Sequence, residues 1–122
     1  MSISVKPTIL ICDDEEGIRE SFKLILEDQY TLKFATNGPE ALEMLKTLSP
    51  ALMMLDIKMP KIHGLEVLKS VKKLRPNLPV IIVTGYQSVE MAQEALKLGA
   101  VDYIPKPFES ASLQKTVSSL VK

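Results

Sequence analysis

Five short apolar runs alternate with segments of helical periodicity, and this alternation constrains the fold more than any other feature of the chain. The runs are rich in strand-favouring residues and occupy positions 8–12, 30–35, 51–55, 80–84 and 101–104. Three of them, 8–12, 51–55 and 80–84, are apolar nearly throughout, which is typical of interior strands in a parallel sheet covered on both faces. The run at 30–35 is more mixed, which favours an edge strand.

Apolar residues recur at helical spacing in each segment that follows a predicted strand. The five stripes are Ile18, Phe22, Ile25 and Leu26; Ala41, Leu42, Leu45 and Leu48; Leu65, Leu68, Val71 and Leu74; Val89, Ala92, Ala95 and Leu96; and Leu113, Val117, Leu120 and Val121. We expect each stripe to pack on the sheet. Pro39 suits the first turn of the second helix, and Gly99 suits a left-handed cap after the fourth.

The alternation predicts an α/β fold built as (βα)5 in a single domain over residues 1–122. Right-handed crossovers place helices on both faces of the sheet, so we expect a three-layer sandwich. The flavodoxin-like strand order 2-1-3-4-5 is one doubly wound solution. Its switch point lies between the first and third strands, and ligands bind there, outside the carboxyl ends of the strands.

Composition excludes several classes of function. Fifteen basic residues balance fifteen acidic ones, so no net charge attracts nucleic acid or an anionic membrane. No apolar run approaches the roughly 20 residues of a membrane span, and the N-terminal residues lack a signal-peptide core. The single cysteine, Cys12, lies in an apolar run and fits a core position in a reducing compartment. We expect a soluble cytoplasmic domain without direct contact with nucleic acid or membrane.

Acidic residues gather where the first and third predicted strands end. The acidic run 13–16 follows the first strand, and Asp56 follows the third. Adjacent strands bring these carboxylates to one edge of the sheet, where their mutual repulsion requires a cation. Oxygen ligands suit Mg²⁺. No histidine or cysteine pair is placed to bind zinc, and His63, which stands alone, is interpreted as a solvated loop residue.

The fourth and fifth predicted strands add a hydroxyl and an ammonium to the same edge, from Thr84 and Lys106. A phosphoryl-transfer site needs such a set: a nucleophilic carboxylate, a metal and a lysine that neutralise phosphoryl oxygens, and a hydroxyl that donates a hydrogen bond. An isolated acid after a strand is often only a favourable charge at a helix N-terminus. Because four strand ends bring chemically matched groups to one edge, a phosphoryl-transfer site is favoured over that interpretation.

At these residues the chain resembles the receiver domains of response regulators, the CheY-like family. The resemblance covers residues 7–121 and rests on ILICDDEE, MLDIKMPKIHG, VIIVTGY and DYIPKPF, in the family's order and spacing. The last motif, with VTGYQSVEMAQEALKLGA before it, is most similar to the N-terminal receivers of NtrC-type transcriptional activators.

The resemblance implies a phosphoacceptor and a Mg²⁺ site at the first and third strand ends. Asp56 matches the phosphoacceptor and is also a metal ligand. Asp14 matches the acid that binds the metal directly, and Asp13 matches the neighbour that assists, often through water. Lys58 stands where the family supplies a backbone carbonyl to the metal.

The remaining site residues are implied to sense the phosphoryl group. Thr84 matches the switch hydroxyl, Lys106 the phosphoryl-binding lysine and Tyr103 the aromatic that changes rotamer. The peptide bond before Pro107 is cis in the family, and Tyr86 is expected to border the site. The basic group at Lys69, Lys72, Lys73 and Arg75 is interpreted as charge that favours a helix C-terminus.

The function that the resemblance implies is two-component signal transduction. A partner sensor histidine kinase or a small phosphodonor phosphorylates Asp56, and the surface made by segments 89–96, 101–104 and 113–121 then changes to control an output, with transcription favoured. The resemblance also implies that two copies can associate through that surface on phosphorylation. The domain catalyses only its own phosphorylation and dephosphorylation, so it is not an enzyme with turnover.

Several alternatives remain open at this stage. The chain is either a stand-alone CheY-like regulator that acts by protein contact or a domain excised from a longer regulator, which the NtrC-type resemblance favours. A Mg²⁺-dependent phosphohydrolase would carry its nucleophile after the first strand, beside a larger cap. An FMN-binding module would need a Ser/Thr/Gly-rich loop where DDEEG, which repels phosphate, stands. A degenerate receiver is disfavoured because no site residue is missing.

Overall fold

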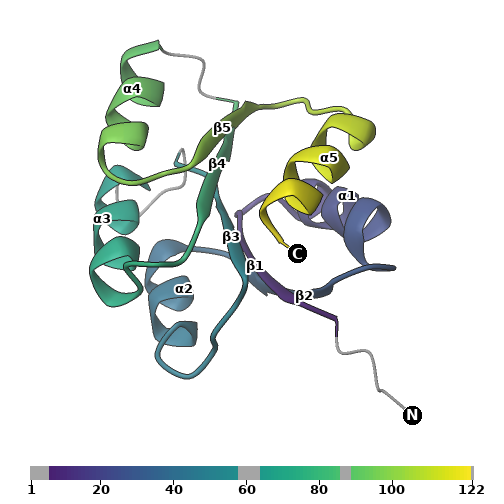
Figure 1. Cartoon of the computed structure of the whole chain (residues 1–122), viewed down its shortest axis with the longest axis horizontal. Helices are drawn as coiled ribbons and strands as arrows, with labels where there is room; N and C mark the ends of the chain where they lie inside the picture. The colour runs from purple at the N-terminus through teal and green to yellow at the C-terminus, as the bar shows by residue number, and fades with distance from the viewer. Residues whose placement is uncertain (1–5, 58–63, 86–88, 122) are drawn as a thin grey trace.

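Strands and helices alternate strictly along the chain in the computed structural model, which describes residues 6–57, 64–85 and 89–121. The strands are β1 (Thr8–Cys12), β2 (Thr31–Ala35), β3 (Leu52–Leu55), β4 (Val80–Thr84) and β5 (Asp102–Pro105). The helices are α1 (Glu16–Leu26), α2 (Gly38–Met44), α3 (Gly64–Leu74), α4 (Val89–Lys97) and α5 (Ser110–Leu120). The predicted (βα)5 pattern is confirmed (Figure 1).

The five strands form one parallel sheet in the order β2-β1-β3-β4-β5, which confirms the predicted topology. Three strands differ from the prediction by one residue, since β2 and β3 begin one position later and β5 is shifted one position onward at both ends. Pro105 consequently ends β5. Because β5 is an edge strand, the missing N–H of that proline costs the sheet little.

The sheet separates two apolar cores. Helices α1 and α5 cover one face, and α2, α3 and α4 cover the other (Figure 1). Neighbouring residues of β1 point to opposite faces: Ile9 and Ile11 join the core under α1 and α5, and Leu10 joins the other. All residues of β3 and β4 are buried, which explains why these strands, apart from Thr84, are apolar instead of alternating.

Helix α4 buries a different face from the one predicted. Val89 and Leu96 are 75% and 49% exposed, whereas Ala95 is buried, and Met91 and Leu98 pack partly buried against the core. Apolar residues in this helix fit two phases of a 3.6-residue repeat, and the structure buries the phase with the longer side chains. Of the four residues predicted to pack on the sheet from this helix, Ala95 is confirmed in the core, and the prediction is wrong for Val89 and Leu96.

Turn residues fix where the helices begin and end. The Asn37 side chain accepts a hydrogen bond from the Glu40 N–H at 2.8 Å, which caps α2 just before Pro39. Gly99 follows α4 with φ of 109°, the left-handed conformation that was predicted for it. Among the residues that the structure describes, no helix combines the length and apolar character needed to cross a bilayer.

Candidate functional site

The backbone of the sheet fixes the two acids that follow β1 and β3. The Asp13 N–H donates to the Ala35 carbonyl at 3.0 Å, and the Asp56 N–H donates to the Cys12 carbonyl at 3.0 Å. The parallel ladder thus continues one residue beyond each strand before the chain turns away. Both acids are held inside the carboxyl edge, with Asp13 2% and Asp56 5% exposed.

The hydroxyl and the lysine come from the next two strands. Thr84 is the last residue of β4 and is fully buried. The Lys106 N–H donates to the Thr84 carbonyl at 2.9 Å, so the backbone of Lys106 is tied to the end of β4. The Lys106–Pro107 peptide bond is cis. Sheet topology therefore brings all four strand ends to one edge, as the sequence predicts.

The ammonium group of Lys106 is the centre of this edge. Its Nζ atom lies 2.7 Å from Asp13 Oδ2 and 3.0 Å from Asp56 Oδ2. It also lies 3.0 Å from Oε2 of Glu15, in the loop between β1 and α1. One cation therefore bridges carboxylates from three separate points of the chain, which draws the end of β5 toward β1 and β3.

Burial and ion pairing act in opposite directions on the acid–base groups of the site. Burial raises the pKa of Asp13, and the hydrogen bonds from Lys106 and from the Glu15 N–H only partly offset this. Burial alone would lower the pKa of Lys106, but its hydrogen bonds to Asp13, Asp56 and Glu15 outweigh burial and raise it. Lys106 therefore remains an ammonium at neutral pH.

Glu15 is a site residue that the sequence prediction missed. Asp14, predicted as the direct metal ligand, is exposed and lines the pocket at this edge. The pocket has a volume of about 450 Å³ and is lined by Asp14, Glu15, Ile18, Asp56, Gly85, Lys106 and Pro107. The four consecutive acids of the sequence were the available signal, but they do not reveal which side chain turns inward.

The oxygen atoms at this edge fit a divalent cation. One carboxylate oxygen each from Asp13, Glu15 and Asp56 lies within 4.8 Å of the others. Three carboxylates face a single ammonium, which leaves negative charge for a cation to balance. All these donors are hard oxygens, as Mg²⁺ and Ca²⁺ prefer. The residues present can therefore hold a metal ion, which would share the carboxylates with Lys106.

Three of the predicted positions fall in parts of the chain that lie outside the described residues: Lys58, His63 and Tyr86. Tyr103 is described. It pairs with Ile82 in the sheet and packs half-buried against the core on the α2, α3 and α4 side. It is one strand further from Asp56 than Thr84, because β4 lies between β3 and β5.

Comparison of the sequence with known proteins identifies one family. Residues 9–118 match the family described as response regulator receiver domain. The chain is 36% identical over 115 residues to the response regulator MprA of Mycobacterium ulcerans, covering 93% of this chain and 50% of the relative. It is 40% identical over 111 residues to the transcriptional regulatory protein ZraR of Klebsiella oxytoca, covering 90% and 25%. The chain thus spans half the length of the first relative and a quarter of the second.

Solved structures agree with the sequence relatives. A CheY-like receiver domain protein from Methanospirillum hungatei superposes with a TM-score of 0.90 at 36% identity, covering 94% of this chain and 93% of the other. The receiver domain of NtrX from Brucella abortus gives a TM-score of 0.87 at 34% identity, covering 93% and 97%. Family, relatives and fold coincide over nearly the whole chain, and we conclude that it belongs to the receiver domains of response regulators, a family of signalling proteins.

Proposed function

We propose that this domain accepts a phosphoryl group on Asp56 and acts as the switch of a two-component system. The observation that carries the proposal is the position of the Asp56 carboxylate. It is nearly buried, lies 3.0 Å from the Lys106 ammonium, and still lines the pocket through which a phosphodonor would approach. Family membership of the chain supports the same assignment.

The chemistry is a transfer to a carboxylate oxygen. An oxygen of Asp56 attacks phosphorus, the bond from phosphorus to the donor's nitrogen or oxygen breaks, and the leaving group departs with the electron pair. The product is an acyl phosphate on Asp56. Lys106 remains beside the reacting oxygen and neutralises charge. Mg²⁺, held by the carboxylates of Asp13, Asp56 and Asp14 or Glu15 and, as proposed from the resemblance, by the Lys58 carbonyl, would supply further neutralisation of the phosphoryl oxygens.

Signal output follows from the strands next to Asp56. We assign Thr84 as the hydroxyl that donates to the new phosphoryl oxygens, because it ends the strand that adjoins β3. Tyr103, on the following strand, is assigned as the side chain that changes rotamer. The surface of α4, β5 and α5 would then differ between the two states and mediate self-association or output contacts.

The partners of the domain belong to the same proposal. The domain would act in the cytoplasm, where a sensor histidine kinase would supply the phosphoryl group. An output domain or target protein would receive the signal, and transcription is the favoured output because one relative is named a transcriptional regulatory protein. The domain would not contact nucleic acid itself, and its catalysis would be limited to its own phosphorylation and dephosphorylation.

Mass spectrometry of the intact protein tests the assignment. Acetyl phosphate with Mg²⁺ should add one phosphoryl mass to the wild type, and chelation of Mg²⁺ should prevent it. Asp56→Asn should acquire none. Asp28→Asn removes an exposed acid after α1 and serves as the matched control, which should be labelled like the wild type. Equal labelling of Asp56→Asn and wild type would refute the role of Asp56.

A further inference from the structure

Glu15 links the acidic loop to the lysine that follows β5. Its side chain is 61% exposed, yet its Oε2 atom lies 3.0 Å from Lys106 Nζ, across 91 positions of sequence. Its own backbone N–H donates to Asp13 Oδ1 at 2.9 Å, which fixes the base of the side chain beside the site. Glu15 therefore reaches the lysine from a backbone that is itself held by a site residue.

The three N–H groups of the Lys106 ammonium match the three carboxylate oxygens around it. These are Asp13 Oδ2 at 2.7 Å, Glu15 Oε2 at 3.0 Å and Asp56 Oδ2 at 3.0 Å. An ammonium has three donors and no acceptor. For Lys106 to donate to a phosphoryl oxygen on Asp56, one of the existing contacts must be released.

The cost of release differs among the three carboxylates. Asp13 is 2% exposed, and its second oxygen is already engaged by the Glu15 N–H. Asp56 is the group that carries the phosphoryl. Glu15 alone among the three can turn into water, which would solvate its charge in place of the ammonium. Release of Glu15 is therefore the least costly way to free a lysine donor.

We propose that Glu15 is a positioning residue that occupies Lys106 in the unphosphorylated site and competes with the incoming phosphoryl group for it. The proposal rests on the proposed function of Asp56 and adds a regulator of its rate. Glu15 stabilises the unphosphorylated state through the ion pair. It opposes the phosphorylated state, because a free carboxylate beside the pocket repels the phosphoryl oxygens. Both effects slow phosphorylation and disfavour the product.

Glu15→Gln tests the competition, since it removes the charge and keeps the side-chain length. At saturating Mg²⁺, we expect acetyl phosphate to label Glu15→Gln about two- to fivefold faster than wild type. This range corresponds to the free energy that an exposed ion pair typically contributes. The ratio should fall toward one as ionic strength rises, because salt screens the exposed charge. A purely structural role would not give that salt dependence.

Glu16→Gln is the matched control. It removes the same charge one residue further on, at the exposed start of α1, and should be labelled at the wild-type rate. If the wild type is labelled and Glu15→Gln is labelled at the same rate, the inference about Glu15 is overturned. The proposed function of Asp56 is unaffected by that result. A slower Glu15→Gln that needs more Mg²⁺ for half-maximal rate would also overturn it, since Glu15 would then be a metal ligand. Absence of labelling in the wild type would refute both proposals.

Discussion

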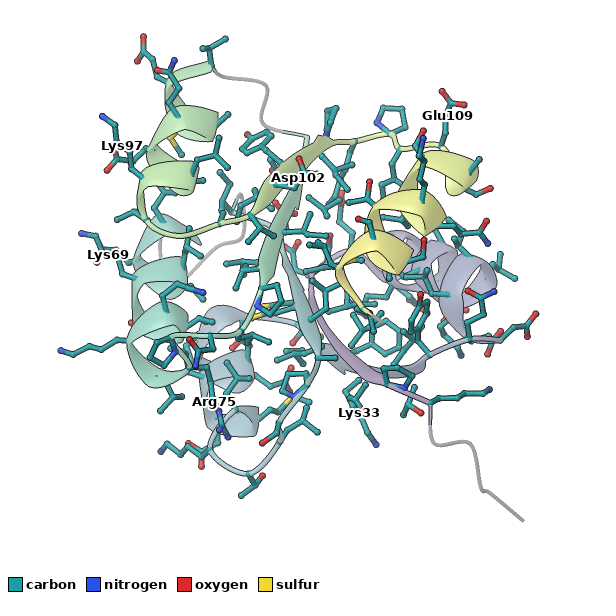
Figure 2. All side chains as sticks on the ribbon, viewed as in Figure 1. Lys33, Lys69, Arg75, Lys97, Asp102 and Glu109 are labelled. Atoms are coloured by element: carbon teal, nitrogen blue, oxygen red, sulfur yellow. The ribbon has the colours of Figure 1, made fainter. Side chains whose placement is uncertain are left out.

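Two partly buried cations at opposite ends of the sheet, Lys106 and Arg75, are held by different kinds of acceptor. At the carboxyl edge, Lys106 contacts three carboxylates. At the amino edge, Arg75 follows α3 and reaches the end of α2 (Figure 2). Its Nε and Nη2 atoms donate to the Leu45 carbonyl at 3.2 and 2.7 Å, and Nη2 also donates to the Leu48 carbonyl at 3.3 Å.

The difference shows which end can change state. Main-chain carbonyls are neutral and are fixed by the backbone after α2, so the acceptors of Arg75 carry no charge that could pass from one cation to another. Carboxylates are charged and can exchange one cation for another. A pocket of about 390 Å³ beside Arg75 is lined by Ser49, Pro50, Ala51, Leu74, Arg75, Pro76, Asn77, Leu78 and Pro79, with no acid among them. The amino edge stabilises the fold, and the carboxyl edge is suited to chemistry.

The strongest test of this contrast is Lys106→Met. Loss of the ammonium removes a cation 3.0 Å from the Asp56 carboxylate, so we expect the rate of phosphorylation by acetyl phosphate to fall about 10²- to 10³-fold. Mass spectrometry over time gives the rate. Calorimetric titration should show that Mg²⁺ still binds, and more tightly, because the ammonium no longer competes for the carboxylates. Unchanged phosphorylation in this variant would mean that Lys106 is only structural.

Gly64→Ala should produce the largest loss of stability. Gly64 begins α3, and a Cβ atom there would overlap the backbone of Ile57, the residue after Asp56. The backbone must shift at the carboxyl edge, at a cost of about 3 kcal/mol. Urea unfolding monitored by circular dichroism measures it, and phosphorylation should slow as Asp56 moves.

Gly17→Ala is the control for that substitution. Gly17 lies in the first turn of α1, and a Cβ atom added there would meet no described atom within 4 Å beyond the adjoining backbone of its own helix. Alanine there should leave stability unchanged or raise it by up to about 1 kcal/mol, because glycine is the weaker helix former. Equal losses at both glycines would contradict the close contact at Ile57.

The sequence predicts the carboxyl edge better than the amino edge, for a physical reason. Parallel strands end at the same side of a sheet, so strand order alone brings Asp13, Asp56 and Lys106 together. For Arg75, the sequence indicates only a charge that favours a helix C-terminus. Its bonds to Leu45 and Leu48 depend on how two loops fold over one another, and no periodicity encodes that.

The sequence does not predict the buried face of α4 or the partner of Lys106, because both depend on how side chains and loops pack. The apolar pattern of α4 admits two phases, and only the fit of Met91 and Leu98 against the core selects one. The choice of Glu15 over Asp14 as the partner of Lys106 depends on the loop conformation after β1, which the Glu15 N–H bond to Asp13 fixes. The first constraint is not local in sequence, and the second concerns a partner, Lys106, that lies 91 positions from Glu15.

Arg75→Met tests the amino edge. The substitution leaves two carbonyls without their charged donor, and we expect unfolding free energy to fall by about 1.5–3 kcal/mol. Phosphorylation should keep its wild-type rate, because Arg75 lies at the opposite end of the sheet from Asp56. Arg75→Lys retains the charge but lacks the planar fork, so it should recover only part of the stability. A change in phosphorylation rate would show that the two ends are coupled.

The smallest expected effect concerns Cys12, whose thiol is a second potential nucleophile near the carboxyl edge. We expect this thiol not to react in the native protein. Its thiol is 1% exposed and donates to the Asn37 carbonyl at 3.3 Å. Burial, followed by the charges of Asp13 and Asp56, raises the pKa of this thiol from 9.0 to about 12. The native protein should therefore keep its thiol protonated over a range of pH in which an unfolded chain forms thiolate.

Alkylation by iodoacetamide measures this difference. Between pH 8 and 10, about one unit either side of the ordinary thiol value, labelling should accelerate in urea-unfolded protein and stay slow in native protein. Because only the unfolded chain releases the proton at these pH values, stability should also decline as pH rises from 9.0 toward about 12. Cys12→Ala, measured in parallel, should lose that decline. Rapid native labelling would show that the carboxyl edge opens far enough to expose β1, and that its chemistry is not confined to Asp56.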